Sequence, residues 1–579
     1  MKEIQATLRE CLLQSEKPSR YVGGEVNAPV FREGAFSFCM CFPEVYEVGM
    51  SNLGTKIVAA SMERAGFAVD WCFAPWPDFG EALRSHGLPL CSLYGRKPLR
   101  EFDMVGFSLG FELSYTNVLY MLDLAGIPLL RRERGDAYPI IACGGPCCVN
   151  PAPLAAFFDL FFIGDGEEAD AEVGRLYLAC KDREEFLRRA AEVKGVYVPA
   201  YPRSRVERAY VADLDKAIYP ESFIVPNCEA VHDRAVIEVM RGCYRGCRFC
   251  QAGFLYRPVR TRSVETLTKQ AQSLIETTGY DELSLNSLST GDYPHLRELL
   301  RSLKEHLPKD VSVALPSLRV DSFDSEFAQD SRKSSLTFAP EAGTQRLRDV
   351  INKDITLEEI LKAANSAFDL GYFSVKLYFM FGLPTETDED LLGIADIAQR
   401  ISDLYHAKKR AKSLRISISA STFIPKPFTP FQWERQASEE EVRHKIEVLR
   451  RALRLRGVTL SWNDYFTSQL EACLARGDER MGDVILEAYR RGCKFDSWME
   501  QLDAESWRAA FAAAGVQPSS YTRAFAEDEV LPWDFVDIGV DKAFFLREKQ
   551  KAYRAESTGG CLDGCKRCGL QKICPKVNL

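Results

Sequence analysis

The sequence predicts an α/β protein in which two alternating regions precede a mainly helical C-terminal region. Short apolar runs alternate with amphipathic stretches from residue 35 to about 200, and again from about 231 to 437. Strands that alternate with helices form parallel sheets. We expect a doubly wound, Rossmann-like sheet in the first region. The second region holds six strand–helix units and predicts a partial relative of the eightfold barrel.

The length of 579 residues exceeds what one hydrophobic core supports, so several domains are expected. The predicted divisions are an N-terminal segment 1–34, a first domain 35–200, a linker 201–230, a barrel 231–437 and a C-terminal region 438–579. A net charge of −8 gives no overall attraction to nucleic acid. Without an apolar leader or a long apolar run, we expect a cytoplasmic protein and no membrane partner.

The predicted strands follow the apolar runs in chain order. Those of the first region are Phe36–Phe42, Gly66–Trp71, Phe102–Ser108, Tyr138–Cys143 and Leu160–Ile163. Those of the second region are Ala235–Met240, Glu282–Asn286, Val311–Leu315, Ser335–Phe338, Phe373–Phe381 and Leu414–Thr422. Helical periodicity is clearest at Leu53–Arg64, Ser263–Thr278, Leu296–His306, Leu357–Leu370 and Asp388–Leu404.

Glycine-rich turns follow three strands of the first region. Ligands of doubly wound sheets lie beyond the carboxyl ends of the strands, and glycine allows the backbone to approach a large ligand closely. The candidate cofactor-binding residues in these turns are Gly49, Ser51, Asn52, Gly144, Gly145, Gly164 and Gly166. The alternative is that these are only tight strand–helix turns. None completes a G-x-G-x-x-G motif, so a nicotinamide cofactor is not expected.

A cysteine loop directly follows the first strand of the second region. Cys243, Cys247 and Cys250 are spaced C-x3-C-x2-C, with Gly242 and Gly246 interleaved. Three thiolates on one loop can hold three corners of an iron–sulfur cube and leave the fourth iron open for chemistry. Ordinary cysteines, or a zinc loop with a distant fourth ligand, are the alternatives.

A second cysteine cluster lies near the end of the chain. Cys561, Cys565, Cys568 and Cys574 form C-x3-C-x2-C-x5-C. Four thiolates make a closed set that suits a second iron–sulfur cluster or a zinc ion, and we favour the cluster. Disulfides are disfavoured because we expect a reducing compartment.

The loop and the motifs after it resemble those of the radical S-adenosylmethionine (SAM) enzymes. The strands of the second region run into Leu288–Asp292, Ala339–Gly343 with Ile351–Lys353, Tyr378–Thr387 and Phe423–Phe431. Together with the turns at Gly144–Pro146 and Gly164–Glu167, these motifs are similar to those of the subgroup that carries an N-terminal cobalamin-binding domain. The resemblance covers residues 35 to about 435.

The resemblance implies a [4Fe–4S] cluster whose open iron is chelated by SAM. An electron, supplied by a donor such as flavodoxin or ferredoxin, then cleaves SAM to a 5′-deoxyadenosyl radical. By motif position Ser289, Thr290, Gly291 and Glu341 would bind SAM, and Gly382 and Pro384 would line its adenine. The arginines Arg257, Arg260 and Arg262 could bind a carboxylate or phosphate, or form a salt-bridged loop.

One departure from the subgroup concerns the cobalamin-binding domain. Many such domains supply a lower cobalt ligand from a D-x-H-x-x-G turn, but the corresponding segment here, Glu44–Gly54, has no histidine. Cobalamin would therefore be bound without a histidine ligand, or the domain has lost it. The expected function is a cobalamin-dependent methyl transfer to an unactivated centre.

Two other functions stay open on sequence alone. The first is a cobalamin-free, methylthiotransferase-like enzyme that modifies RNA. Its basic surface could come from the runs Lys408–Lys412 and Arg450–Arg456, although such runs are usually solvated helix faces. The second is a non-enzymatic iron–sulfur protein that senses redox state.

Overall fold

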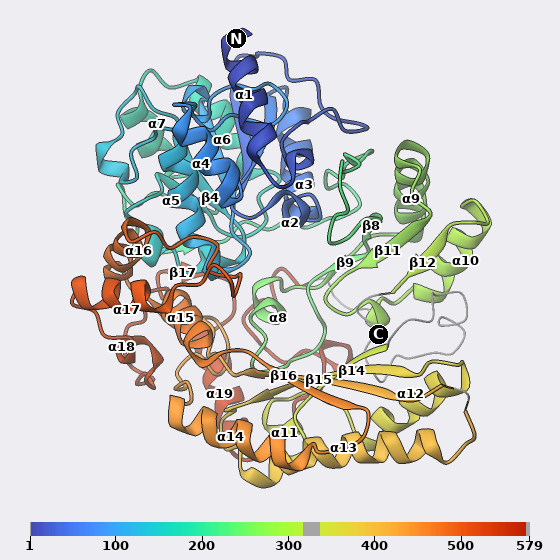
Figure 1. Cartoon of the computed structure of the whole chain (residues 1–579). Helices are drawn as coiled ribbons and strands as arrows, with labels where there is room; N and C mark the ends of the chain where they lie inside the picture. The colour runs from blue at the N-terminus through green and yellow to red at the C-terminus, as the bar shows by residue number, and fades with distance from the viewer. Residues whose placement is uncertain (1, 316–335, 411, 575–579) are drawn as a thin grey trace.

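The computed structural model describes residues 2–315, 336–410 and 412–574. Figure 1 shows the first domain above a lower sheet, with the short helix α8 (Gln251–Leu255) between them. The sheet β8–β11–β12 lies to one side, and the orange helices of the C-terminal region lie to the other. None of the described helices is long and apolar enough to cross a membrane.

The first domain is built on a six-stranded sheet with the strand order β2-β1-β3-β4-β5-β6. All neighbouring strands are parallel except β5 and β6. The strands are β1 (Ser37–Phe42), β2 (Ala68–Phe73), β3 (Met104–Ser108), β4 (Ile140–Gly144), β5 (Leu160–Phe162) and β6 (Val196–Tyr197). The helices are α1 (Lys2–Gln14), α2 (Tyr46–Gly49), α3 (Leu53–Arg64), α4 (Pro77–Ser85), α5 (Tyr115–Leu124), α6 (Ala169–Leu178) and α7 (Arg183–Ala190).

Both faces of this sheet are buried. Along β1, Cys39 and Cys41 enter one hydrophobic core, and Phe38, Met40 and Phe42 enter the other. Such a strand needs helices on both sides, which is the doubly wound arrangement that the sequence predicted. The order 2-1-3-4-5 places the topological switch point between β1 and β3, where ligands of such sheets bind.

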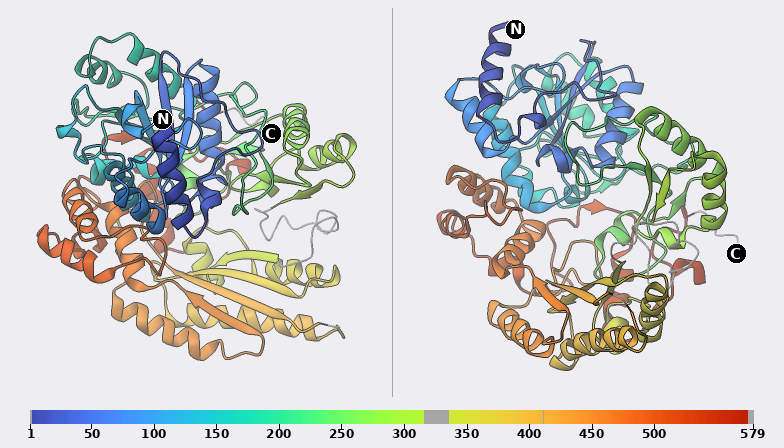
Figure 2. Two further views of the ribbon diagram at one scale, coloured as in Figure 1. Left: turned by 45° about the horizontal axis from the view of Figure 1, so that its top comes forward. Right: turned by 45° about the vertical axis from the view of Figure 1, so that its right-hand side comes forward.

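The barrel region forms two parallel sheets, ordered β12-β11-β8 and β13-β14-β15-β16. Both views in Figure 2 show the first domain stacked over these strands. The strands are β8 (Ala235–Glu238), β11 (Glu282–Asn286), β12 (Ser312–Ala314), β13 (Leu336–Glu341), β14 (Ser374–Phe381), β15 (Arg415–Thr422) and β16 (Val458–Trp462). Their helices are α9 (Val264–Thr278), α10 (Leu296–His306), α11 (Gln345–Val350), α12 (Leu357–Asp369), α13 (Asp388–His406) and α14 (Glu439–Ala452).

Two features of the barrel differ from the expected single run of six units. The first predicted strand is divided, because the short strand β9 (Met240–Arg241) pairs antiparallel with β10 (Arg260–Thr261). Among the described residues β12 and β13 are not paired, and predicted strand residue Ser335 lies outside that part of the chain.

The second sheet continues beyond residue 437, where the sequence predicted a mainly helical region and no strand was assigned. Strand β16 pairs in parallel with β15, and α14 forms the crossover between them. The alternation in Val458-Thr-Leu-Ser-Trp462 is the strand signal that the helical interpretation missed.

The rest of the C-terminal region joins the other parts. It contains α15 (Tyr465–Arg476), α16 (Arg480–Arg490), α17 (Ala504–Ala513), α18 (Ser519–Thr522) and α19 (Lys542–Tyr553). Its strand β17 (Val536–Asp537) pairs with β7 (Val206–Glu207) of the linker. Glu44 of the first domain accepts hydrogen bonds from the Ser497 hydroxyl at 2.8 Å and the Trp498 indole at 2.9 Å.

Candidate functional site

A cavity of about 350 Å³ lies between the first domain and the barrel. One wall consists of residues of β1, β3, β4 and β5 and of the turns after β4 and β5, and it includes the two strands that flank the switch point of the sheet. The opposite wall is formed by β8, β9 and the loop after β11. The phenylalanine and methionine residues of its lining are Phe38, Met40, Met62, Met104, Phe107, Phe162 and Met240.

Four of the seven predicted cofactor-binding residues line this cavity: Gly144, Gly145, Gly164 and Gly166. Gly145 and Gly164 have φ of +107° and +103°, and an added Cβ would lie 2.4 and 2.1 Å from backbone oxygens of the protein itself. These two turns therefore require glycine for their own geometry. Gly144 differs, because the nearest atom to an added Cβ is 3.8 Å away.

The other three predicted residues, Gly49, Ser51 and Asn52, do not line the cavity. An added Cβ on Gly49 would lie 2.3 Å from the Phe73 ring, so this glycine allows close packing. The Ser51 hydroxyl donates to the Glu47 carbonyl at 2.9 Å. The Asn52 side chain caps α3 by accepting from the Thr55 N–H at 3.0 Å. Leu53 and Gly54 form the wall instead.

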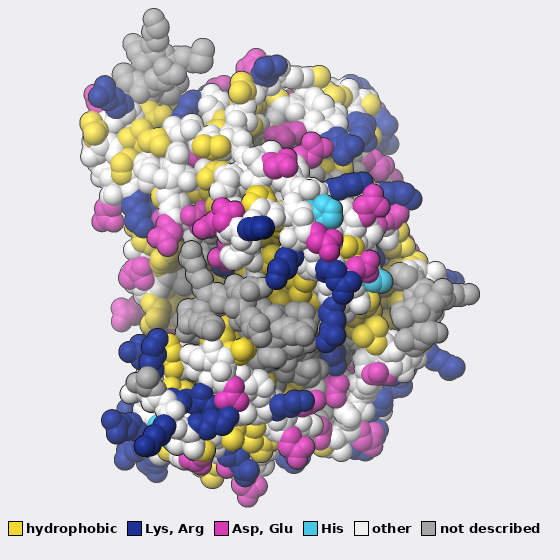
Figure 3. Space-filling model, turned by 90° about the vertical axis from the view of Figure 1, so that its right-hand side faces the viewer, with side chains coloured by type: hydrophobic (Ala, Val, Ile, Leu, Met, Phe, Trp, Pro, Cys, Tyr) yellow, Lys and Arg dark blue, Asp and Glu magenta, His cyan; other side chains and the backbone are white. Residues whose placement is uncertain are grey.

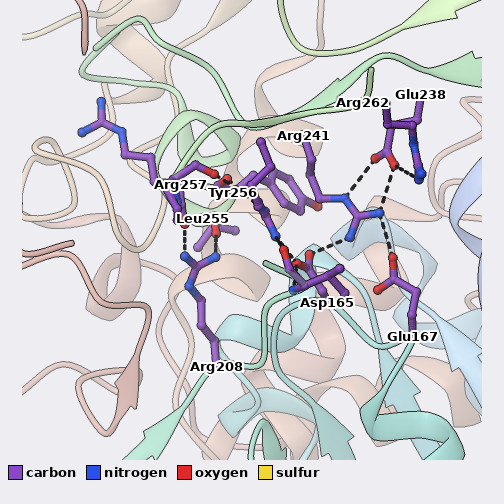
Figure 4. A network of polar contacts seen from close by, with 12 residues as sticks. Asp165, Glu167, Arg208, Glu238, Arg241, Leu255, Tyr256, Arg257 and Arg262 are labelled. Carbon is purple, nitrogen blue, oxygen red and sulfur yellow. Dashed lines mark hydrogen bonds and ion pairs between the residues drawn. The ribbon is translucent and has the colours of Figure 1, made fainter. Parts of the chain in front are cut away.

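A buried ion-pair network ties the two walls together (Figure 4). Arg241 on β9 pairs with Asp165 at 3.0 Å, with Glu167 at 2.8 Å and with Glu238 at 2.9 Å. Arg260 pairs with the same Asp165 at 2.5 Å. Two carboxylates of the first domain are thus held by two cations of the barrel.

Arg260 and Arg262, predicted either to bind an anionic ligand or to form salt bridges, are salt-bridged. Arg262 is 1% exposed and pairs with Glu238 at 3.2 Å. Arg257 is also buried, and it donates to the carbonyls of Gly253 and Arg245 at 3.1 and 3.0 Å.

The network shifts the pKa values of its carboxyl groups. Burial by itself would raise the pKa of Asp165, but the charges of Arg241 and Arg260 outweigh burial and lower it. Burial would also raise the pKa of Glu238, but the charges of Arg241 and Arg262 outweigh it and lower the pKa. Both groups are therefore held ionised inside the protein.

This arrangement predicts that the interface is weakened by acid. Carboxyl groups with lowered pKa stabilise the folded state fully above about pH 4.5, and this contribution is lost as the pH falls through the lower folded-state pKa values. We expect the melting temperature of Glu238→Gln to lie below that of wild type at pH 7, with a difference that shrinks toward about pH 3. The exposed Glu276→Gln on α9 is the control. A pH-independent difference would contradict the prediction.

The cysteine loop begins at Gly242, whose φ is +95° and whose added Cβ would lie 2.6 Å from the Tyr256 carbonyl. Within the loop, the Arg245 N–H donates to the Cys243 sulfur at 3.4 Å. Cys250 directly precedes α8. In the described parts of the chain, no three or more His, Cys, Asp or Glu residues are placed to hold a single metal ion, and this holds equally for both cysteine clusters.

The residues predicted to bind SAM follow the carboxyl ends of β11, β13 and β14. Ser289 and Thr290 are buried and shape their own turn. The Ser289 hydroxyl donates to Asp292 at 2.6 Å and the Thr290 hydroxyl to the Leu285 carbonyl at 3.2 Å. Gly291 lies in the same short 3₁₀ turn, Thr290–Asp292. The Asp292 carboxylate accepts hydrogen bonds from two guanidinium nitrogens of Arg245, at 2.6 and 3.0 Å, and so joins this turn to the cysteine loop.

Glu341 ends β13 with φ of +67°, a strained conformation for a residue other than glycine. It forms an ion pair with Lys353 at 3.1 Å. Gly382, with φ of +79°, donates its N–H to Glu386 at 3.0 Å, and Pro384 follows in the same turn. The roles of these residues toward SAM stay predictions.

Asp170, on the first turn of α6, lines the cavity, although no motif in the sequence indicated it. It is 6% exposed, and no hydrogen bond to its carboxyl group is found among the described residues. Burial, reinforced by the charge of Glu167, raises its pKa well above the usual value. The raised pKa favours the protonated form of this carboxyl group, which can donate a hydrogen bond. In the sequence, Asp170 cannot be distinguished from the acidic residues that are common in the first turn of a helix.

Comparison with known proteins gives two family matches. The family model for the N-terminal region of radical SAM proteins matches residues 54–199, and the model for the radical SAM superfamily matches residues 237–398. An uncharacterised protein of Methanocaldococcus jannaschii is 32% identical over 390 residues, which are 67% of this chain and 80% of that protein.

Two further similarities are to proteins whose names state an activity. A probable threonylcarbamoyladenosine tRNA methylthiotransferase of Archaeoglobus fulgidus is 24% identical over 207 residues, 32% of this chain and 48% of that protein. The solved structure of the radical SAM methyltransferase TsrM from Kitasatospora setae, with cobalamin and a [4Fe–4S] cluster bound, superposes with a TM-score of 0.52. The match covers 82% of this chain and 99% of TsrM at 13% identity, which establishes similarity of fold.

Proposed function

We propose that this chain, which belongs to the radical SAM superfamily, is a corrinoid-dependent radical SAM methyltransferase. The superfamily implies a [4Fe–4S] cluster and SAM. The observation that carries the methyl-transfer proposal is the position of the cavity. It lies at the switch point of the first domain and extends to Arg241 and Gly242, directly before Cys243. A cofactor held by the first domain would thus face the site of SAM cleavage.

The cysteine loop fits the cluster by its chemistry. Its three thiols are the soft ligands that iron–sulfur clusters require, and a backbone N–H already reaches the sulfur of Cys243. When bound, the cluster supplies the electron that cleaves the sulfonium bond of SAM. The protein holds the loop rigid: Arg245 ties it to Asp292 after β11, and Gly242 allows β9 to turn into it.

The cavity fits the face of a corrin ring in three respects. Its lining is largely apolar, it includes no histidine, and the protonated form of Asp170, which burial favours, can donate a hydrogen bond to a carbonyl or amide oxygen. A complete cobalamin is larger than this cavity, so its nucleotide part would lie outside or the two walls would move apart. The similarity to the TsrM structure supports the proposal, because TsrM is a methyltransferase and its structure holds cobalamin.

A second candidate is the modification of RNA, favoured by the tRNA methylthiotransferase among the relatives. The basic runs support it weakly. Lys408 and Arg410 both pair with Asp369, at 2.7 and 3.0 Å, and Arg451 pairs with Glu447 at 2.7 Å. On the face in Figure 3, basic side chains are interspersed with acidic ones. Membership of the radical SAM superfamily, which consists of enzymes, does not support the third possibility, a non-enzymatic redox sensor.

The proposed function predicts that purified protein retains about one corrinoid per chain after incubation with hydroxocobalamin and gel filtration. Gly144→Leu should abolish this retention, because its side chain would project into the cavity without backbone strain. Gly110→Leu is the matched control, since Gly110 is exposed, has no atom within 4 Å of an added Cβ and does not line the cavity. Corrinoid absorbance and iron content are measured together.

If wild type retains no corrinoid while it still cleaves SAM, the methyl-transfer proposal fails and the superfamily chemistry stands. Equal retention by wild type and Gly144→Leu would place the corrinoid elsewhere.

A further inference from the structure

The four C-terminal cysteines repeat the spacing of the catalytic loop. Cys561, Cys565 and Cys568 are separated by three and two residues, as Cys243, Cys247 and Cys250 are, and Cys574 adds a fourth thiol. Gly564 and Gly569 have φ of +109° and +111°, which other residues rarely adopt, so the loop between the thiols turns tightly. The set supplies a full complement of cluster ligands where the catalytic loop leaves one iron open.

This C-terminal loop lies directly against the catalytic loop. The Cys561 N–H donates to the Tyr244 carbonyl at 2.7 Å. Because Tyr244 directly follows Cys243, this hydrogen bond brings one cysteine of each set close to the other. Asn352 bridges the two segments as well. Its amide donates to the carbonyls of Gly246 and Thr558, both at 3.0 Å, and its oxygen accepts from the Thr558 N–H at 2.7 Å.

A buried arginine lies close to the catalytic loop and to the C-terminal thiols. Arg257 is 4% exposed and donates to the Arg245 carbonyl of the catalytic loop at 3.0 Å. Its Nη1 is buried and has no hydrogen-bond partner among the described residues. The charge of Arg257 acts on the thiols of both Cys561 and Cys574, so the guanidinium lies near these two side chains. An unpaired guanidinium N–H near these thiols can donate a hydrogen bond to an anionic cluster that they hold.

We propose that Cys561, Cys565, Cys568 and Cys574 hold a second [4Fe–4S] cluster that delivers electrons to the catalytic loop, an inference that rests on the proposed function. A reduced one-electron carrier would lose one electron to the C-terminal site. That site would pass the electron to the catalytic site, and no atom or proton is transferred. Arg257 offsets the negative charge of the C-terminal cluster.

The surface around this site suits an acidic carrier protein. Cys565 and Cys574 are exposed, so the cluster would lie near the surface. Arg567 and Lys572 are also exposed, and Lys566 lies between them and Cys565 in the chain. Complementary charge guides such short-lived encounters.

The first test counts iron, acid-labile sulfide and zinc in three anaerobically reconstituted proteins. They are wild type, the loop variant Cys243→Ala/Cys247→Ala/Cys250→Ala, and the tail variant Cys561→Ser/Cys565→Ser/Cys568→Ser/Cys574→Ser. We expect about eight iron atoms in wild type and about four in each variant, with a reduced-cluster EPR signal in the loop variant. A loop variant that holds no iron, or about one zinc ion, overturns the proposal.

Two substitutions keep the test decisive if the tail variant does not fold. Cys574→Ser removes an exposed thiol and should alter the EPR signal of the loop variant without unfolding it. Arg257→Met in the same background should shift the reduction potential to more negative values, and Arg257→Lys should restore part of the shift. The exposed Arg554→Met is the control. An unchanged signal in Cys574→Ser, or an unchanged potential in Arg257→Met, would overturn the assignment.

The relay is tested by reducing the catalytic cluster with flavodoxin or with dithionite. With flavodoxin, the tail variant and Arg567→Glu/Lys572→Glu should be reduced more slowly by roughly tenfold or more, whereas dithionite reduces all proteins alike. Equal flavodoxin rates overturn the relay. Because the cluster counts and potentials need no SAM, they decide this inference even if SAM cleavage, and with it the proposed function, fails.

Discussion

Replacing Cys247 by alanine is expected to abolish reductive cleavage of SAM and to remove about four iron atoms per chain. The loop offers three thiols for the four iron atoms of the cluster. Without Cys247, two iron atoms would have no protein ligand, and the two remaining thiols would not retain the cluster. The protein's own supports of the loop, Gly242 and the Arg245–Asp292 contact, do not depend on this side chain. The variant should therefore remain folded.

The measurement combines iron content with the methionine released from SAM by the reduced protein. Cys228→Ala is a matched control, because Cys228 is also a partly exposed free thiol and belongs to neither cysteine cluster. It should retain both iron and activity. If Cys247→Ala kept its catalytic iron and cleaved SAM, the loop would not be the site of the chemistry.

Replacing Arg248 by methionine is expected to destabilise the protein by about 3–5 kcal/mol. Arg248 lies inside the cysteine loop, yet its side chain is fully buried and turns away into the structure. It pairs with Glu548 of α19 at 3.0 Å and donates to the backbone carbonyls of Asp349, Val350 and Glu556 at 2.7–2.9 Å. Without it, Glu548 would keep a buried charge with no guanidinium partner.

Urea unfolding followed by tryptophan fluorescence measures this effect as a lower midpoint. Glu548→Gln should lose less stability, because an amide oxygen can still accept from Arg248. The exposed pair Arg443–Glu439, at 2.6 Å, supplies the control: Arg443→Met should change stability by about 0.5 kcal/mol or less. Equal midpoints for Arg248→Met and Arg443→Met would show that the buried pair does not hold the C-terminal region on the loop.

Local patterns were sufficient for the secondary structure of both α/β regions. Helix α3 spans the predicted Leu53–Arg64 and strand β11 the predicted Glu282–Asn286, because each is delimited by its own periodicity and end signals. The short strand β16 was missed, because five residues of alternation beside charged helices carry little signal without the partner strand β15. Pairing, a tertiary contact, decided that segment.

In the candidate site, too, some features follow from the local sequence and others only from tertiary contacts. The two cysteine clusters and the turns at Gly144 and Gly164 were found from spacing and residue type, which are properties of the chain alone. Sequence could not separate glycines that line the cavity from Gly49, which packs on Phe73. It also left open whether Arg260 and Arg262 bind an anion, because their partners Asp165 and Glu238 lie 95 and 24 residues away.

The sequence by itself determined the α/β class, the parallel sheets and the thiols that can carry iron, because these depend on periodicity, spacing and side-chain chemistry. Only the tertiary structure decided that the cavity of the first domain opens beside Cys243 and that the C-terminal cysteines lie against Tyr244. Those placements depend on hydrogen bonds and buried ion pairs between residues far apart in the chain, such as Arg248 and Glu548, which are separated by 300 positions. No local pattern in the chain encodes such contacts.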